Sequence, residues 1–155
     1  KIYLDNDIYD IQDGKYKSAI ENINKSLELK SDWEIPYFYR AVAYHAMENF
    51  NEAMLDYTKA LQLNDKMTDA YFNRAKIILS RKDIENPDIK AAVSDLEKAL
   101  ELDDKFIDAL YAMACAQKKL ENYEDAIKYL DRLIEIEPDA VNAKALKKLI
   151  QQKYM

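Results

Sequence analysis

The segment NYEDAIKYLDRLIEIEP, residues 122–138, predicts an amphipathic helix that ends at a proline. The same arrangement of aromatic, acidic, alanine and leucine positions occurs upstream in KYKSAIENINKSLELKS (15–31) and NFNEAMLDYTKALQLND (49–65). A pattern that returns at a fixed interval indicates a repeat architecture, in which each unit packs against its neighbours. These three segments therefore decide the predicted fold class.

Small residues mark the interval of the repeat. One series of alanines is spaced 34, 39 and 34 residues apart, and a second series, in the preceding helical segments, is spaced 34 and 39 apart. Small side chains let helices cross closely, because a bulky side chain would force the axes apart. We therefore predict units of two helices joined by a short polar turn. The first series is Ala19, Ala53, Ala92 and Ala126, and the second is Ala41, Ala75 and Ala114.

The composition supports an all-α fold and narrows the function. The 155 residues include one glycine and three prolines, which are too few breakers for a turn-rich β fold. The net charge of −6 disfavours a nucleic-acid partner, and no apolar run approaches the roughly 18 residues of a membrane span. The first residue is lysine, so we expect a piece of a longer protein. One cysteine excludes an internal disulfide and favours a reducing compartment such as the cytoplasm.

This pattern resembles the tetratricopeptide repeat, a helix-turn-helix unit of 34 residues with small residues at both crossings. The resemblance covers residues 15–140 and implies an α-solenoid of antiparallel helix pairs that forms a right-handed superhelix. The sequence departs from the family where alanine replaces a frequent glycine. In place of a leading tryptophan stand Tyr37, Tyr71 and Leu110, which we expect in the core, and the closing proline remains only at Pro138.

We expect a single domain over residues 1–155, closed by a capping helix. The five extra residues of the third repeat fall within 80–90, where Asn86 and Pro87 predict the start of the next helix. In the capping helix we expect Val141, Ala145, Leu149 and Ile150 to line the apolar side. The expected parts are a partial, irregular first repeat (1–33), a repeat (34–67), a repeat with the insertion (68–106), a repeat (107–140) and the capping helix (141–155).

The resemblance also implies that the first helix of each unit lines a concave groove. Helical spacing would then point Phe38, Phe72 and Tyr111 into it, with other candidates about one turn further on. Aromatic and basic side chains are good anchors for a peptide or a partner helix. Aromatic residues at this spacing are equally consistent with a core position. The candidate protein-binding residues are Phe38, Val42, Phe72, Asn73, Lys76, Tyr111, Cys115, Lys118 and Lys119.

The function favoured by these features is a protein–protein interaction scaffold, and the alternative is a structural module that self-associates into a homo-oligomer. One subgroup of the family captures acidic chaperone tails with lysines, asparagines and an arginine. Here only Asn73 matches, while Phe38, Val42, Asp108 and Ala112 replace the required residues. An aspartate would repel a carboxylate, so capture of a chaperone tail is disfavoured.

No catalytic, cofactor or metal site is predicted. The one histidine, His45, and the one cysteine, Cys115, lie two units apart, which is about 20 Å for helices spaced by 8–10 Å. No Cys/His cluster occurs, and one glycine is too few for a phosphate loop. We therefore expect no enzyme and no cofactor. Residues 139–155 carry a charge of +3, which reads either as a solvated helix face or as a patch for an acidic partner.

Overall fold

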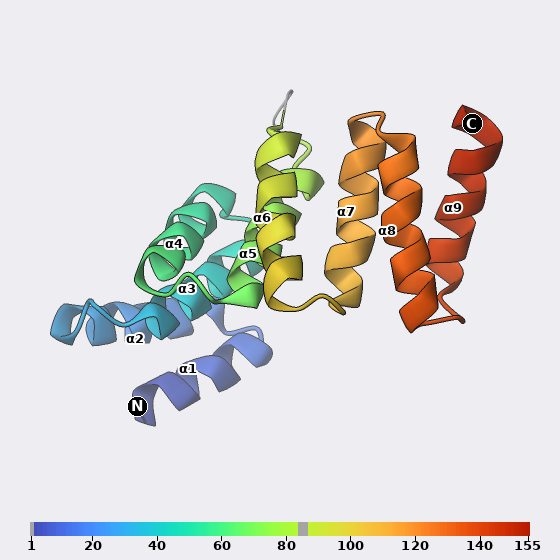
Figure 1. Cartoon of the computed structure of the whole chain (residues 1–155). Helices are drawn as coiled ribbons and strands as arrows, with labels where there is room; N and C mark the ends of the chain where they lie inside the picture. Colours follow the sequence, from blue (N-terminus) through green and yellow to red (C-terminus); the bar gives the residue numbers. More distant parts are fainter. Residues whose placement is uncertain (1, 84–86) are drawn as a thin grey trace. The chain divides into compact units, whose positions relative to one another are not determined.

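The computed structural model describes residues 2–83 and 87–155, with side chains from Asp7 onward. Within these ranges the chain forms nine α-helices and no strand, which confirms the all-α prediction (Figure 1). No helix in the described part is both long and apolar enough to cross a membrane. The helices are α1 (Ile2–Gln12), α2 (Tyr16–Leu29), α3 (Glu34–Ala46), α4 (Phe50–Leu63), α5 (Thr68–Ser80), α6 (Ile89–Leu102), α7 (Ile107–Lys119), α8 (Tyr123–Ile136) and α9 (Val141–Tyr154).

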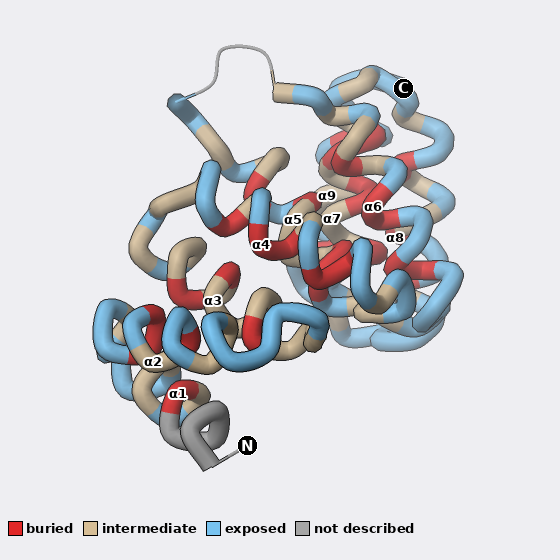
Figure 2. The backbone as a smooth tube through the Cα atoms, turned by 90° about the vertical axis from the view of Figure 1, so that its left-hand side faces the viewer, coloured by how far each residue is buried: buried red, intermediate tan, exposed pale blue. Residues whose placement is uncertain are grey.

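The chain divides into two compact units, Lys1–Ile77 and Ile78–Met155, called unit 1 and unit 2 below. In unit 1, α1 packs on α2, α2 on α3, and α3 on α4. In unit 2, α6 packs on α7, α7 on α8, and α8 on α9. Buried positions recur along the helices of both units, between stretches of exposed residues (Figure 2). Each unit is therefore built from helices that pack on their neighbours in the sequence.

The small residues that mark the repeat are buried as predicted. All seven alanines of the two series have no exposed surface. Two further series in the first helices follow the same interval and are also buried. They are Pro36, Ala70, Ala109 and Ala143, and Ala43, Ile77, Ala116 and Ile150.

The turns within the helix pairs share one geometry. Glu48 and Glu121, which follow α3 and α7, both have φ of 61°, and Gly14 after α1 has φ of 81°. In the left-handed conformation the backbone N–H of each residue donates to a carbonyl three residues earlier, at 3.0–3.1 Å. This arrangement satisfies the last carbonyls of a helix and reverses the chain.

Polar side chains also repeat their contacts at the interval of 34 residues. Arg40 Nη1 donates to Asn24 Oδ1 at 2.8 Å, and Arg74 Nη1 donates to Thr58 Oγ1 at 3.1 Å. Each arginine therefore ties its own helix to the second helix of the preceding pair. These bonds show that the repeat fixes polar contacts as well as the core.

The leading residues of the first helices are partly as expected. Tyr71 and Leu110 are buried, whereas Tyr37 is only half-buried. The hydroxyl of Tyr37 donates to the Ser31 carbonyl at 2.9 Å, and that of Tyr71 donates to the Asp65 carbonyl at 3.0 Å. Both tyrosines thus pin the loop before their helix, and the polar tip of Tyr37 remains near solvent.

The insertion lies in the segment that follows α5 and does not lengthen the helix. α5 has 13 residues, as α3 and α7 have. The predicted start of α6 is wrong, because this helix begins at Ile89. Asp88 is its N-cap, and its Oδ1 accepts a bond from the Ala91 N–H at 3.0 Å. Pro87 precedes the cap, and Asn86 lies outside the described residues.

The predicted apolar side of the last helix is also wrong, except at Ile150. Val141 and Leu149 are 76% and 47% exposed, and Ala145 is exposed too. The buried residues of α9 are Ala143 and Ile150. They stand 34 residues after the buried Ala109 and Ala116 of α7, so α9 keeps the register of the earlier first helices.

The first helix buries a carboxylate. Asp7 of α1 is fully buried, and neither of its oxygens has a hydrogen-bond partner among the described residues. Burial raises the pKa of this carboxyl above its ordinary value of 3.8, the Asn22 side chain opposes the rise, and the charge of Asp10 adds to it. The ionised form therefore destabilises unit 1.

Asp7→Asn is expected to raise the free energy of unfolding at pH 7 by about 1–2 kcal/mol, because it removes an uncompensated buried charge. A raised folded-state pKa makes the carboxyl favour folding below about pH 3.8, and this contribution is lost as the pH rises through the folded-state pKa. The advantage of the variant should therefore disappear in acid. Urea titrations followed by Trp33 fluorescence measure it, with the exposed Asp13→Asn as control. A variant less stable than the wild type at pH 7 would contradict the expectation.

Candidate functional site

The three aromatic residues predicted for the groove are all half-buried and lie on the first helices of their pairs. Phe38 belongs to α3, Phe72 to α5 and Tyr111 to α7. Phe38 and Phe72 fall in unit 1, and Tyr111 falls in unit 2. The predicted ladder is thus divided between the two units, and its continuity stays a prediction.

In unit 1, Phe38 rests on a buried aromatic ring. Its centroid lies 5.8 Å from that of Tyr57 of α4, with the planes at 60°, and 5.3 Å from that of Tyr39. Tyr57 is fully buried, so an edge-to-face contact joins α3 to α4 and holds the Phe38 ring in place. One side of Phe38 therefore serves the core, while its exposed part is available to a ligand.

Asn73 lies beside the Tyr57 hydroxyl. This hydroxyl is buried and has no hydrogen-bond partner among the described residues. Burial raises the pKa of the Tyr57 phenol well above its ordinary range, and the neighbouring Asn73 side chain opposes the rise only in part. The phenol is therefore neutral, and Asn73 is half-buried.

Lys76 of α5 places a positive charge beside Phe72. Lys76 is exposed, and its Nζ lies 5.9 Å from the centroid of the Phe72 ring, one turn back on α5. Among the described residues Lys76 forms no ion pair. Its charge is therefore free to meet an anionic group.

Val42 and His45 follow Phe38 by four and seven residues, so they lie on the same side of α3 as Phe38. Both are half-buried. The His45 ring contacts Phe50 edge to face, with centroids 5.9 Å apart. Burial, and then the positive charge of Lys76, lower the pKa of His45. The imidazole is therefore neutral at physiological pH, and Lys76 supplies the positive charge among the candidate residues of unit 1.

In unit 2, Tyr111 and Cys115 lie one turn apart on α7 and are half-buried. Burial raises the pKa of the Cys115 thiol, and the charges of Lys118 and Lys119 oppose this in part. Burial and the thiol also raise the pKa of Tyr111. Both groups are neutral at pH 7, so Cys115 lacks the thiolate character of a reactive cysteine.

Lys118 makes a contact that sequence reasoning missed. Its Nζ lies 5.7 Å from the centroid of the Tyr154 ring at the end of α9. Tyr154 in turn stacks on Tyr123 at the start of α8, with centroids 4.5 Å apart and planes at 9°. No interval of the repeat links these residues, so no sequence signal could have found them. Lys119 is exposed.

The described residues contain no group of three or more histidine, cysteine or acidic side chains that could hold a metal ion. The candidate residues offer aromatic and apolar surface, an amide and positive charges. Unit 1 holds Phe38, Val42, Phe72, Asn73 and Lys76, and unit 2 holds Tyr111, Cys115, Lys118 and Lys119. In unit 1, the Tyr57 ring contacts Phe38 and its hydroxyl lies beside Asn73.

Two family profiles match the chain. One is described as tetratricopeptide repeat and matches residues 35–67; the other is described as Fis1 C-terminal tetratricopeptide repeat and matches residues 107–154. The two matches cover the pairs α3–α4 and α7–α8, and the second continues through α9.

Curated relatives match over part of the chain. Tetratricopeptide repeat protein 12 of Homo sapiens is 35% identical over 71 residues, which are 46% of this chain and 10% of that protein. Sperm-associated antigen 1 of Rattus norvegicus is 36% identical over 76 residues, which are 49% of this chain and 8% of that protein. The matched region is thus about a tenth of the length of these relatives.

Solved structures share the fold over more of the chain. MamA from Desulfovibrio magneticus RS-1 superposes with a TM-score of 0.87 at 16% identity, over 98% of this chain and 83% of that one. The first tetratricopeptide-repeat domain of Spaghetti (RPAP3), bound to the HSP90 peptide SRMEEVD, superposes with a TM-score of 0.69 at 24% identity, over 77% of this chain and 90% of that one. Identities this low establish likeness of fold alone.

Proposed function

Because the chain belongs to the tetratricopeptide-repeat family, we propose that it is a protein-interaction module that holds a peptide or helix of a partner protein on its first helices. Phe38 and Phe72 are the apolar contacts in unit 1, and Tyr111 is the contact in unit 2. Lys76 in unit 1 and Lys118 in unit 2 each offer a positive charge to an anionic side chain of the partner.

The observation that carries this proposal is the half-burial of the aromatic residues at matching positions. A core residue at these positions would be enclosed, as Tyr57 and Leu110 are. A residue with only a solvent role would rarely be phenylalanine twice and tyrosine once. The Phe38 ring is held against the buried Tyr57 ring. A ring that is already fixed loses little conformational entropy on binding, which makes it an effective anchor.

The partner is not expected to be a chaperone tail like the one bound by the Spaghetti domain. Phe38 and Val42 of α3 offer no positive charge to a terminal carboxylate. In α7, Asp108 is exposed and would repel an acidic peptide. A partner with an apolar side chain for the aromatic residues, and one acidic side chain for Lys76, fits the charges better.

Phe72→Ala is expected to lower recovery of the bound partner by about tenfold or more, because an aromatic anchor supplies much of the affinity of an interface. The measurement is affinity capture from the source lysate, with quantification of what each variant retains, followed by titration of the purified partner. Lys76→Glu should reduce affinity as well, since it reverses the charge without touching the core.

Leu55→Ala is the matched control, because Leu55 is 72% exposed on α4, which is a second helix. It should retain the partner like the wild type, and Phe72→Leu separates loss of the ring from loss of stability. Equal recovery by wild type and Phe72→Ala would remove unit 1 from the proposed site. Light scattering over a dilution series tests the alternative of self-association, which predicts a mass that grows with concentration.

A further inference from the structure

The contact between α1 and α2 holds an aspartate where the later helix pairs hold an alanine. Asp7 stands 34 residues before Ala41 and, like the three alanines of that series, has no exposed surface. In α2, Ala19 belongs to the matching series of the second helices and is equally enclosed. The first pair therefore places a carboxyl group at a crossing that elsewhere takes a small apolar side chain.

The described part of the chain gives Asp7 no counter-charge. Neither carboxylate oxygen has a hydrogen-bond partner there, although the Asn22 side chain of α2 is close enough to favour the ionised form. Asp10, on α1 itself, is negative and disfavours that form. α3 also packs on α1, and none of its described groups shifts the pKa of Asp7. Ionisation of Asp7 therefore costs free energy while α1 is docked, and the cost is relieved once the carboxylate reaches water.

The next helix pair shows what the first one lacks. There the enclosed carboxylate of Asp56 accepts two hydrogen bonds from Arg40 of α3, at 2.7 and 2.8 Å. Asn6 stands 34 residues before Arg40, so the repeat supplies no arginine to the first pair. A buried carboxylate without such a partner weakens the interface that encloses it.

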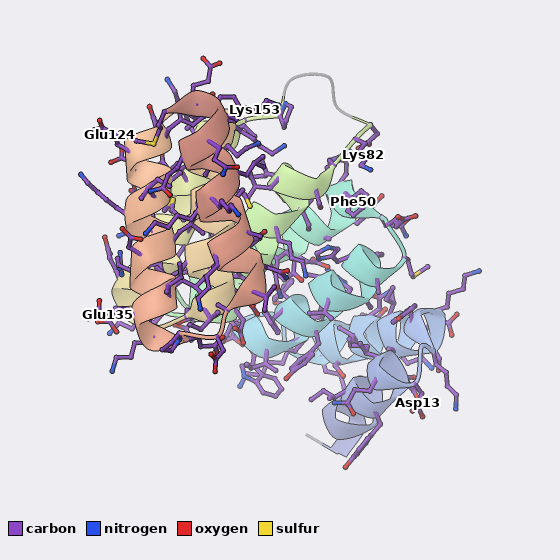
Figure 3. All side chains as sticks on the ribbon, turned by 90° about the vertical axis from the view of Figure 1, so that its right-hand side faces the viewer. Asp13, Phe50, Lys82, Glu124, Glu135 and Lys153 are labelled. Carbon is purple, nitrogen blue, oxygen red and sulfur yellow. The ribbon has the colours of Figure 1, made fainter. Side chains whose placement is uncertain are left out.

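The position of α1 allows it to leave without unfolding the rest of unit 1. It packs on α2 and, less extensively, on α3 (Figure 1). In a stack of helices each element contacts its neighbours alone, so a helix at one end opens at the loss of few contacts. The turn that joins α1 to α2 contains Gly14 with φ of 81° and the exposed Asp13, which Figure 3 labels. Release of α1 uncovers the side of α2 that carries Ala19 and Ile23, which are now fully buried.

We propose that α1 is a pH-dependent cover of α2, docked when the Asp7 carboxyl group is protonated and released when it is ionised. Burial raises the pKa of Asp7 in the docked state above its ordinary value of 3.8, which it regains in water. Docking is therefore strongest below about pH 3.8, weakens as the pH rises through the docked-state pKa, and is constant above it. The helices α2, α3 and α4 stay folded in both states. None of the candidate partner-binding residues takes part, so the cover is independent of the proposed function.

The test is hydrogen–deuterium exchange of the full chain, with mass spectrometry of peptides from α1 and α4, at about pH 4.5 and about pH 7.5. Each exchange rate is compared with that of an unstructured peptide of the same sequence at the same pH, which gives a protection factor. In the wild type, protection of α1 should fall by about fivefold or more between the two pH values, because the carboxyl ionises in this range. Protection of α4 should not fall.

Three variants connect this effect to the buried carboxyl group. Asp7→Ala restores the residue of the later crossings, and it should raise the protection of α1 at about pH 7.5 by about tenfold and abolish its pH dependence. Asp7→Asn keeps the shape of the side chain and should act in the same direction, which separates the charge from the packing. Asp13→Asn removes an exposed carboxylate from the adjoining turn and should behave like the wild type.

Protection of α1 that is independent of pH in the wild type would overturn the proposal. So would a parallel fall in α1 and α4, because Asp7 would then act on the stability of the whole of unit 1 and not on α1 alone. Wild-type behaviour of both Asp7→Ala and Asp7→Asn, or loss of the pH dependence in Asp13→Asn, would show that another group controls the helix.

Discussion

Ala126→Leu is expected to lower the free energy of unfolding by about 1–3 kcal/mol. Ala126 has no exposed surface, and its helix, α8, packs against both α7 and α9. Three additional carbon atoms cannot be accommodated at a closed crossing unless the helices separate or neighbouring side chains leave their rotamers. Urea denaturation followed by far-UV circular dichroism measures the loss.

Ala145→Leu is the control, because it makes the same substitution in the same unit at an exposed position. Leucine and alanine are both strong helix formers, so this variant should stay within about 0.5 kcal/mol of the wild type. Ala92→Leu in α6 should behave like Ala126→Leu, since Ala92 is equally enclosed. Neutral effects at both buried sites would show that the alanine series does not mark the helix crossings.

The alanine series could be predicted from the sequence because a small residue at a crossing is required wherever the same packing recurs. The repeat interval also indicates which residues of α9 are buried, whereas the apolar pattern of α9 itself points to a different side of the helix. Val141, Ala145 and Leu149 form the better apolar row by local spacing, but Ala143 and Ile150 stand in the repeat register and are buried. Contact with α8, inherited from the repeat, therefore outweighs local amphipathicity.

The candidate site was less predictable, because binding surfaces depend on contacts between distant side chains. The position of Phe38 on its helix follows from the repeat, yet its packing on Tyr57 depends on the α3–α4 pairing. The contact of Lys118 with Tyr154 joins α7 to the end of α9 and follows no interval. The predicted start of α6 is wrong because both Asn86 and Asp88 are residue types that cap helices. Asp88 is the N-cap, and its side chain accepts the hydrogen bond from the Ala91 N–H.

Asp56→Ala is expected to lower the free energy of unfolding by about 2–3 kcal/mol, because it leaves a partly buried guanidinium without its counter-charge. Arg40 Nε and Nη2 donate to the two carboxylate oxygens of Asp56 at 2.7 and 2.8 Å. The side chains of Arg40 and Asp56 are only 21% and 8% exposed. The hydrogen bonds that Arg40 donates to Asp56 raise the pKa of Arg40. The guanidinium stays charged in the variant, because its ordinary pKa already lies far above neutral pH. The Asn24 side chain would still accept a hydrogen bond from Arg40, and the Tyr37 ring centroid lies 5.7 Å from the guanidinium carbon.

The sequence holds a trace of this pair, since Arg40 and Arg74 are 34 residues apart and Asp56 and Asp95 are 39 apart, both at intervals of the repeat. The double variant Arg40→Met/Asp56→Leu should recover most of the loss, because an apolar pair of similar volume needs no counter-charge. Asp125→Ala is the control, since its pair with Lys128 is exposed and long at 3.8 Å, and it should cost under about 0.5 kcal/mol. A double variant that is no more stable than Asp56→Ala would show that Asp56 acts through packing, and that the ion pair does not hold α3 to α4.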